Sequence, residues 1–120
     1  MSKARYVQRG ETLDYFNGTE DIIRAGEVIP LITRIGVAGT EIPPGKTGSI
    51  HVCGAFEIPK TGDSAILMGT AVFFDGIGIT DKEKEDAADD GGETVSYVPA
   101  GYAAAGAQQG DTVVLVKLLG

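Results

Sequence analysis

Apolar and polar residues alternate along residues 48–58, and this pattern predicts the central strand of the fold. One face of the extended chain would carry Ile50, Val52, Phe56 and Ile58, and the other Ser49, His51, Cys53 and Glu57. A period of two is typical of a strand with one buried face. We expect Pro59 to end the strand, because proline has no N–H to donate to a sheet ladder.

The rest of the chain predicts short strands between turns, at residues 5–8, 12–16, 27–37, 70–75, 94–97, 98–105 and 112–118. Asn17-Gly18 is a hairpin signal, since both residues tolerate a positive φ. Pro30 interrupts the apolar run of residues 27–37, which predicts a bent strand with one end at a sheet edge or bulge.

One short helix is expected at residues 65–68, capped by the segment 62–64 and stopped by Gly69. A glycine followed by a polar residue and then a strand recurs at Gly10, Gly26, Gly45, Gly69 and Gly110, at unequal spacings. Frequent turns with almost no helical periodicity favour an all-β fold. We predict a small barrel or sandwich of short, mostly antiparallel strands with about one short helix.

Charge is unevenly distributed along the 120 residues, whose net charge is −7. Residues 1–9 hold Lys3, Arg5 and Arg9 and no acidic residue, whereas residues 81–93 hold seven acidic residues and two lysines. We therefore expect a basic N-terminal arm at 1–9, and a single β domain at 10–120 with a mobile acidic surface loop at 81–93.

The composition argues against several classes of protein. An acidic chain repels a phosphate backbone, so nucleic acid is not an expected partner. No apolar run approaches the length of a membrane span, and no signal-peptide pattern opens the chain. A single cysteine excludes an internal disulfide and fits a reducing compartment. We expect a soluble protein made in the cytoplasm, with no membrane partner.

Residues 39–47 resemble a phosphate-binding P-loop, and residues 71–75 resemble the apolar strand that ends in a magnesium-binding aspartate. Three features argue against a nucleotide site. The glycines are separated by five residues instead of four, Pro43 and Pro44 lack N–H groups, and a β pattern follows where a helix should begin. A degenerate P-loop at 39–47 remains the alternative reading.

No other group of residues predicts catalysis, a metal or a cofactor. His51 and Cys53 are two residues apart on one predicted face, but a zinc site needs three or four ligands. Glu57 could add one ligand, and no second histidine or cysteine exists. The acidic segment lacks the ligand spacing of a calcium loop, and Ser64 lies in no nucleophile elbow. We expect no enzyme activity.

The chain resembles the cement, or decoration, proteins of tailed-phage capsids, a family long labelled as a predicted RecA/RadA phage recombinase. The most specific matching motif is Gly54-Ala55-Phe56-Glu57-Ile58-Pro59-Lys60. Weaker motifs follow the family's order at residues 6–8, 10–13, 25–28, 42–48, 69–75, 101–103 and 110–116. The acidic segment 81–93 is longer than usual for the family and is interpreted as an insertion.

The resemblance implies a structural virion protein on the outer capsid surface that stabilises the expanded head by bridging major capsid subunits. Its expected partners are the major capsid protein and neighbouring copies of itself, and a homotrimer would fit. We expect capsid or protomer contacts from Lys3, Arg5, Tyr6, Arg9, Pro43 and Pro44. The alternative for residues 1–9 is a disordered terminus. Alternatives for the whole chain are a nucleotide-binding recombination protein and a surface-displayed binding module.

Overall fold

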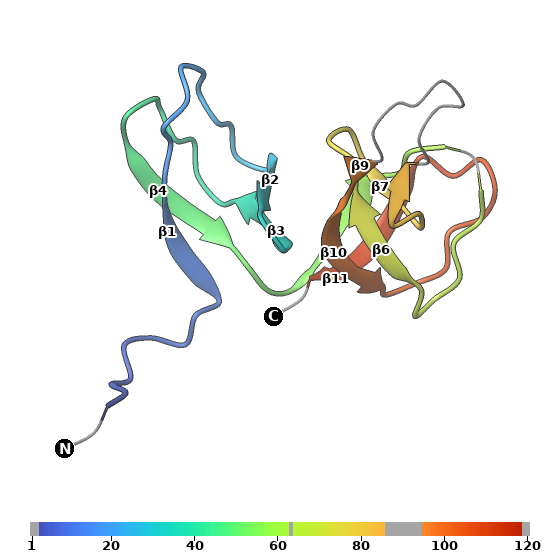
Figure 1. Cartoon of the computed structure of the whole chain (residues 1–120), viewed down its shortest axis with the longest axis horizontal. Helices are drawn as coiled ribbons and strands as arrows, with labels where there is room; N and C mark the ends of the chain where they lie inside the picture. Colours follow the sequence, from blue (N-terminus) through green and yellow to red (C-terminus); the bar gives the residue numbers. More distant parts are fainter. Residues whose placement is uncertain (1–2, 63, 86–94, 119–120) are drawn as a thin grey trace.

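The computed structural model describes residues 3–62, 64–85 and 95–118, and it is built from β-strands. Two lobes lie side by side along the longest axis (Figure 1). The first lobe is a four-stranded sheet in the order β1-β4-β3-β2, with bounds Thr12–Phe16 (β1), Val28–Leu31 (β2), Arg34–Ala38 (β3) and Thr47–His51 (β4).

The second lobe is a five-stranded sheet in the order β5-β11-β10-β6-β7. Its strands are Ala55–Pro59 (β5), Ala71–Phe74 (β6), Ile79–Thr80 (β7), Val98–Ala103 (β10) and Val113–Leu118 (β11). A separate two-stranded ladder joins Lys84–Glu85 (β8) and Val95–Ser96 (β9). All pairs between these strands are antiparallel, which confirms the predicted all-β class; the arrangement is sandwich-like and is not a closed barrel.

The predicted central strand is two strands in two different sheets. β4 ends at His51 and β5 begins at Ala55, so the linker between them carries the chain from one lobe to the other. Gly54 in this linker has a φ of 111°, which breaks the extended run. Pro59 belongs to β5 instead of following it, because its missing N–H would face away from the neighbouring β11.

Three further predictions were wrong: a single bent strand at 27–37, a hairpin turn at 17–18 and a helix at 65–68. Residues 27–37 form two strands, β2 and β3, joined by a tight turn, although Pro30 does lie on an edge strand as predicted. Asn17-Gly18 does not close a hairpin, because β1 pairs with the distant β4. Residues 65–68 are not helical: Ile66 makes an isolated bridge to Ala107, and the chain then turns.

The remaining strand predictions agree with the structure to within a few residues, at β1, β6, β9, β10 and β11. Residues 5–8 form no strand. The predicted acidic loop contains β8, and its residues 86–93 lie outside the part of the chain that the structure describes.

Four of the five recurring glycines occupy the same kind of turn. The turns are residues 24–27, 43–46, 67–70 and 108–111, and in each the fourth N–H donates to the first carbonyl at 3.0–3.1 Å. The third residue is a glycine with φ between 76° and 91°. Only a residue that tolerates a positive φ fits this position of a type II turn, which explains why glycine recurs there. The fifth, Gly10, leads into β1.

These turns mark a framework that both lobes repeat. Each lobe brings two of them together through a mutually hydrogen-bonded pair, Ile23 with Ile42 in the first lobe and Ile66 with Ala107 in the second. When the turns are matched, the strands of the two lobes correspond in order: β1-β4-β3-β2 in the first lobe matches β5-β11-β10-β6 in the second. The backbone bonds also correspond: Gly26 N donates to Ala38 O at 2.7 Å, and Gly69 N donates to Ala103 O at 2.8 Å.

The hydrophobic cores repeat in the same way. The first lobe's own core consists of Ile29, Ala38, Ile42, Ile50 and Val52. The matching positions of the second lobe, all in its core, are Val72, Ala103, Ala107, Val116 and Leu118. Ile35 and Val37 of β3 join this second core, since β3 packs against β10. The two lobes are therefore joined through a shared core, and β7 to β9 are an addition to the repeated framework.

Candidate functional site

The loop that resembles a P-loop is a structural connection between β3 and β4. Three of its backbone donors are already used: Ile42 N donates to Ile23 O at 2.7 Å, Gly45 N to Asn17 O at 2.8 Å, and Lys46 N to Pro43 O at 3.1 Å. A phosphate-binding loop must instead direct free N–H groups at its ligand. The strand β4 follows directly, so no helix N-terminus faces the loop.

The pair His51 and Cys53 does not share one strand, because His51 ends β4 and Cys53 lies in the linker. The imidazole of His51 packs against Phe56, with ring centroids 5.7 Å apart and planes tilted by 44°. Among the described residues, no cluster of three or more His, Cys, Asp or Glu side chains could hold a metal ion. The arrangement is that of a packing contact between the lobes.

Asp75 caps the turn between β6 and β7. Its Oδ1 accepts hydrogen bonds from the N–H groups of Ile77 and Gly78, both at 2.9 Å. Partial burial by itself raises the pKa of this carboxyl, but the bonds from Gly78 and Ile77 favour its charged form, and the net result is a pKa below the ordinary value. The resemblance of residues 71–75 to a strand that ends in a magnesium-binding aspartate was rejected on the sequence, and the structure gives Asp75 a role in a turn.

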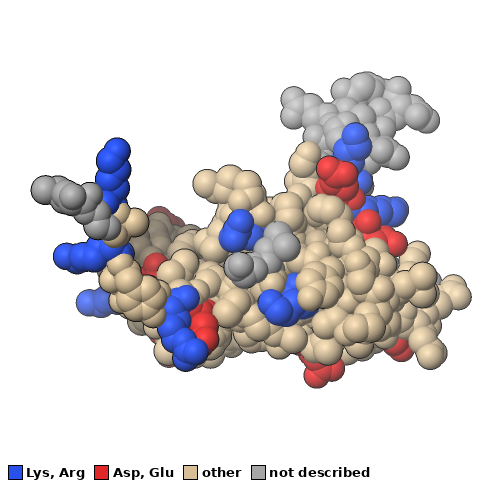
Figure 2. All heavy atoms as spheres, turned by 90° about the horizontal axis from the view of Figure 1, so that it is seen from below, with Lys and Arg blue, Asp and Glu red and all other residues tan. Residues whose placement is uncertain are grey.

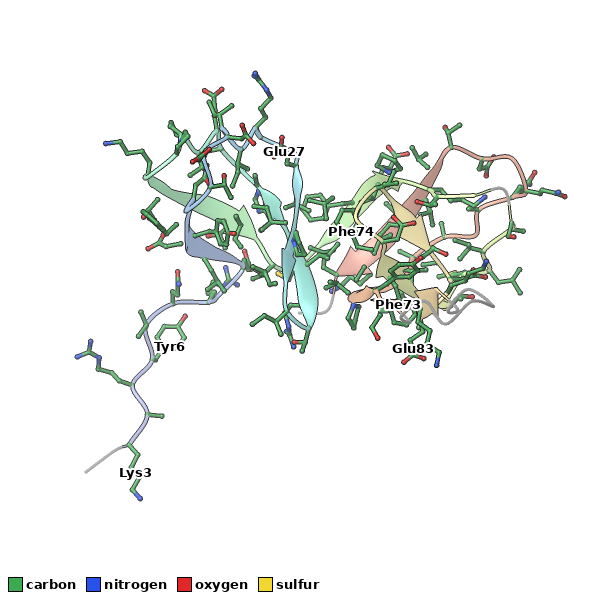
Figure 3. All side chains as sticks on the ribbon, turned by 45° about the horizontal axis from the view of Figure 1, so that its top comes forward. Lys3, Tyr6, Glu27, Phe73, Phe74 and Glu83 are labelled. Carbon is green, nitrogen blue, oxygen red and sulfur yellow. The ribbon has the colours of Figure 1, made fainter. Side chains whose placement is uncertain are left out.

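The N-terminal arm leaves the first lobe as an exposed segment without helix or strand, and its first described residues lie at one extreme of the described chain along the longest axis (Figure 1). Tyr6 and Val7 are 79% and 75% exposed. Lys and Arg side chains gather around this end in Figure 2. Figure 3 shows Lys3 and Tyr6 on the arm, far from the second lobe, where Phe73 and Phe74 are labelled.

Pro43 and Pro44 lie in the turn 43–46, at the opposite end of β1 from the arm. The carbonyl of Asn17, which follows β1, accepts the Gly45 N–H, whereas the arm precedes β1. A five-residue strand separates the two, roughly 17 Å at 3.4 Å per residue. The structure thus exposes both predicted contact segments but does not bring them into one site.

A groove of about 440 Å³ between the lobes was missed by sequence reasoning. The turn 24–27 and strands β2, β3 and β4 of the first lobe form one side, and β5 forms the other. Its wall includes Val28, Val37, Phe56 and Ile58, with His51 and Glu57 as polar groups. Nothing in the alternating pattern indicates that β4 and β5 separate to open this space.

Several turn tips expose apolar side chains that sequence reasoning also did not single out. Ile32, between β2 and β3, is 94% exposed and has a φ of 46°. Leu67 and Met68 of the turn 67–70 are exposed as well. A β-branched residue at positive φ is strained, so the conformation of Ile32 costs stability.

Among the described residues, no helix is long and apolar enough to cross a membrane. No curated protein and no solved structure matches the chain. A family model described as phage cement protein matches residues 7–118, nearly the whole length. This chain therefore belongs to the phage cement proteins, structural components associated with the virion capsid.

Proposed function

We propose that the protein binds the outer surface of a phage head and stabilises the expanded shell by bridging major capsid subunits. The observation that carries this proposal is that the two expected contact segments, the arm and the turn 43–46, are exposed at opposite ends of β1. A body that bridges two subunits needs two separated contact surfaces held in a fixed relation. Synthesis in the host cytoplasm is part of the proposal.

Bridging gains strength from geometry. Once one surface is bound, the second faces its partner at a high effective concentration, so two weak contacts can hold firmly. If the contact sites have the right spacing only in the expanded lattice, binding favours that lattice by linkage.

The contacts proposed at the first lobe are Lys3, Arg5, Tyr6 and Arg9 of the arm, and Pro43 and Pro44 of the turn 43–46. The arm is exposed and basic, so it suits an acidic surface on the capsid or on a neighbouring copy. The turn is held by hydrogen bonds to the body, so it can meet a partner with little loss of conformational entropy.

Co-sedimentation of the purified protein with phage heads that lack it tests the proposal. We expect saturable binding to expanded heads, little binding to unexpanded heads, and a higher temperature of head disruption when the protein is bound. Electron microscopy of the decorated heads should place each copy across a boundary between capsid subunits. Equal binding to both lattices, or a copy seated within one subunit, would contradict bridging.

Two variants separate the proposed contacts. Replacing Lys3, Arg5 and Arg9 together by glutamine should weaken head binding and make it less sensitive to salt. Replacing Lys82 and Lys84, which lie on the side of the second lobe, by glutamine removes two positive charges far from the arm and is the control. If both variants bind heads equally well, the arm is not a capsid contact.

A further inference from the structure

We propose that the arm of one copy adds as a strand to the free edge of β5 in a neighbouring copy, within the groove between the lobes. This proposal takes the arm as a contact segment, as above, and assigns its partner. It concerns two copies of the chain and requires no capsid, so it can fail or succeed independently of head binding.

The hydrogen bonds of β5 show which of its groups face outward. Lys60 N donates to Thr112 O, and Leu118 N donates to Gly54 O, so the even-numbered residues of β5 face β11. In an antiparallel ladder the alternate residues direct their N–H and C=O the other way. Ala55 and Glu57 therefore present unused backbone donors and acceptors at the edge.

The edge is open for a limited length. Beyond Pro59, Ile79 bridges to Lys60 and accepts a hydrogen bond from Thr61 N at 2.8 Å, which covers the strand's continuation. Ala55 and Glu57 remain uncovered, and together they offer two N–H and two C=O groups. An incoming segment of three to four residues would use all of them, in the mode of β-strand addition.

The groove lies against this edge. Four consecutive residues of β5, from Phe56 to Pro59, line it. Side chains of consecutive residues point to opposite faces of a sheet, so a space that all four border must run along the strand's edge. Val28 and Val37 form the apolar wall opposite, where a side chain of an added strand would pack.

The arm fits this position in sequence and charge. It forms no helix or strand of its own, and Tyr6-Val7 consists of strong strand formers. It carries three basic residues and no acid, whereas the rest of the chain carries seven basic and seventeen acidic residues. Glu57 is the acidic residue on the groove, and no lysine or arginine lines it. An arm seated there would bring Arg5 or Arg9 near Glu57.

The arm points away from its own groove, toward the far end of the molecule (Figures 1 and 3), which favours a neighbouring copy as the acceptor. Such a contact joins unlike surfaces of two copies. It can therefore close into a ring, of which a trimer is one case, or continue from copy to copy.

The repeated framework supplies a matched control edge. Asp14 of β1 corresponds to Glu57 of β5, and both are exposed acidic residues on an edge strand. Val52 N donates to Glu11 O and Asn17 N donates to Lys46 O, so the N–H of Asp14 also faces outward. The groove does not border β1. A change at Asp14 therefore alters an equivalent strand edge that does not border the groove, where no arm is proposed to bind.

Disulfide trapping between two full-length variants tests the contact, with Cys53→Ser in every chain. One chain carries a cysteine at Arg5, Tyr6, Val7 or Gln8 in turn, and its partner carries Glu57→Cys or Asp14→Cys. We expect mixed dimers with Glu57→Cys for alternate arm positions, because side chains of an added strand face one side at every second residue. Few mixed dimers should form with Asp14→Cys.

Equal trapping at Glu57→Cys and Asp14→Cys, no trapping above random collision, or trapping without alternation would overturn the proposal. A second test uses Glu57→Pro, which removes one outward N–H and no bond to β11, with Asp14→Pro as its control. Glu57→Pro alone should abolish trapping between Ala55→Cys and the best arm cysteine. Thermal unfolding checks that both proline variants fold. Trapping that fails while head binding persists would reject this contact and leave the proposed function standing.

Discussion

Asn17 anchors the turn that carries Pro43 and Pro44. Its side chain is fully buried; Nδ2 donates to Asp21 O at 2.8 Å and to Ile42 O at 2.9 Å, while Oδ1 accepts from Thr19 N. Its backbone also bonds to the turn, donating to Lys46 O and accepting from Gly45 N. The residue therefore connects the end of β1 to two loops at once.

Replacing Asn17 by alanine should lower the free energy of unfolding by about 2–3 kcal/mol, because its buried side chain loses the hydrogen bonds to the carbonyls of Asp21 and Ile42 and to the backbone N–H of Thr19. Urea unfolding measures this. Lys60 is the control, since it holds the matching position after β5 and its Nζ makes only long, exposed contacts to Gln108 O and Asp111 O. Lys60→Ala should cost less than about 1 kcal/mol; equal losses would show that Asn17 is no anchor.

Asp75 makes stability depend on pH in a predictable direction. Its pKa is lower in the folded protein than the ordinary 3.8. A depressed folded pKa stabilises the native state above the unfolded value, and this contribution is lost as the pH falls through the folded pKa. Asp75→Ala should therefore be less stable than the natural chain at neutral pH, and the difference should shrink well below pH 3.8. Urea midpoints across this range measure it; a difference independent of pH would contradict it.

The strands that sequence reasoning found correctly are those whose pattern is local. The run 112–118 was predicted as a strand, and in β11 Val114, Val116 and Leu118 are buried on one face. Sequence reasoning failed where partners lie far apart in the chain. Asn17-Gly18 carries a hairpin signal, but the tertiary contacts of Asn17 with Ile42 and Lys46 decide its conformation.

The same reasoning explains the misread centre of the chain. Alternation continues through residues 48–58 because Ile50 and Ile58 are both buried, yet they belong to the cores of different lobes. A period of two cannot reveal a change of sheet. The charge pattern of the sequence predicted the basic arm. The groove could not be predicted, because it depends on the separation of β4 and β5 at Gly54.

Gly101 shows what the pairing of β10 with β11 demands. Its φ is 138°, and a side-chain carbon there would collide with the backbone carbonyl oxygen of Lys117. Gly110 also has a positive φ, 86°, but a side-chain carbon there would meet open space. Comparing substitutions at the two glycines therefore distinguishes the cost of backbone strain alone from the added cost of a steric collision.

Gly110→Ala should cost only the strain of the left-handed conformation, about 1–2 kcal/mol. Gly101→Ala should cost clearly more, because the strands cannot keep their distance, and it should lower the thermal unfolding midpoint further. Differential scanning calorimetry of both variants measures this. Similar midpoints would mean that the sheet yields at Gly101 without loss.

The shared core should make the two lobes unfold as one unit. Ile35 is 1% exposed and lies in β3, yet it packs in the second lobe's core. Ile35→Ala should lower stability by about 2–5 kcal/mol, as for other large-to-small core changes. It should also reduce cooperativity, because it removes contact between the lobes. Ile50→Ala, in the first lobe's own core, should lower stability without separating the transitions.

Amide hydrogen exchange followed by NMR reports each lobe separately. In the natural chain the slowest amides of both sheets should share one opening free energy, since they open together. In Ile35→Ala the two sets should diverge. Divergence already in the natural chain would show that the lobes are independent.

The repetition of one framework, with β3 meeting β10, has the form of two similar half-molecules joined face to face. Separating the lobes would uncover the apolar face of Ile35 and Val37, which β3 presents to β10. Cutting the chain at Cys53, between the lobes, should therefore leave neither half soluble alone.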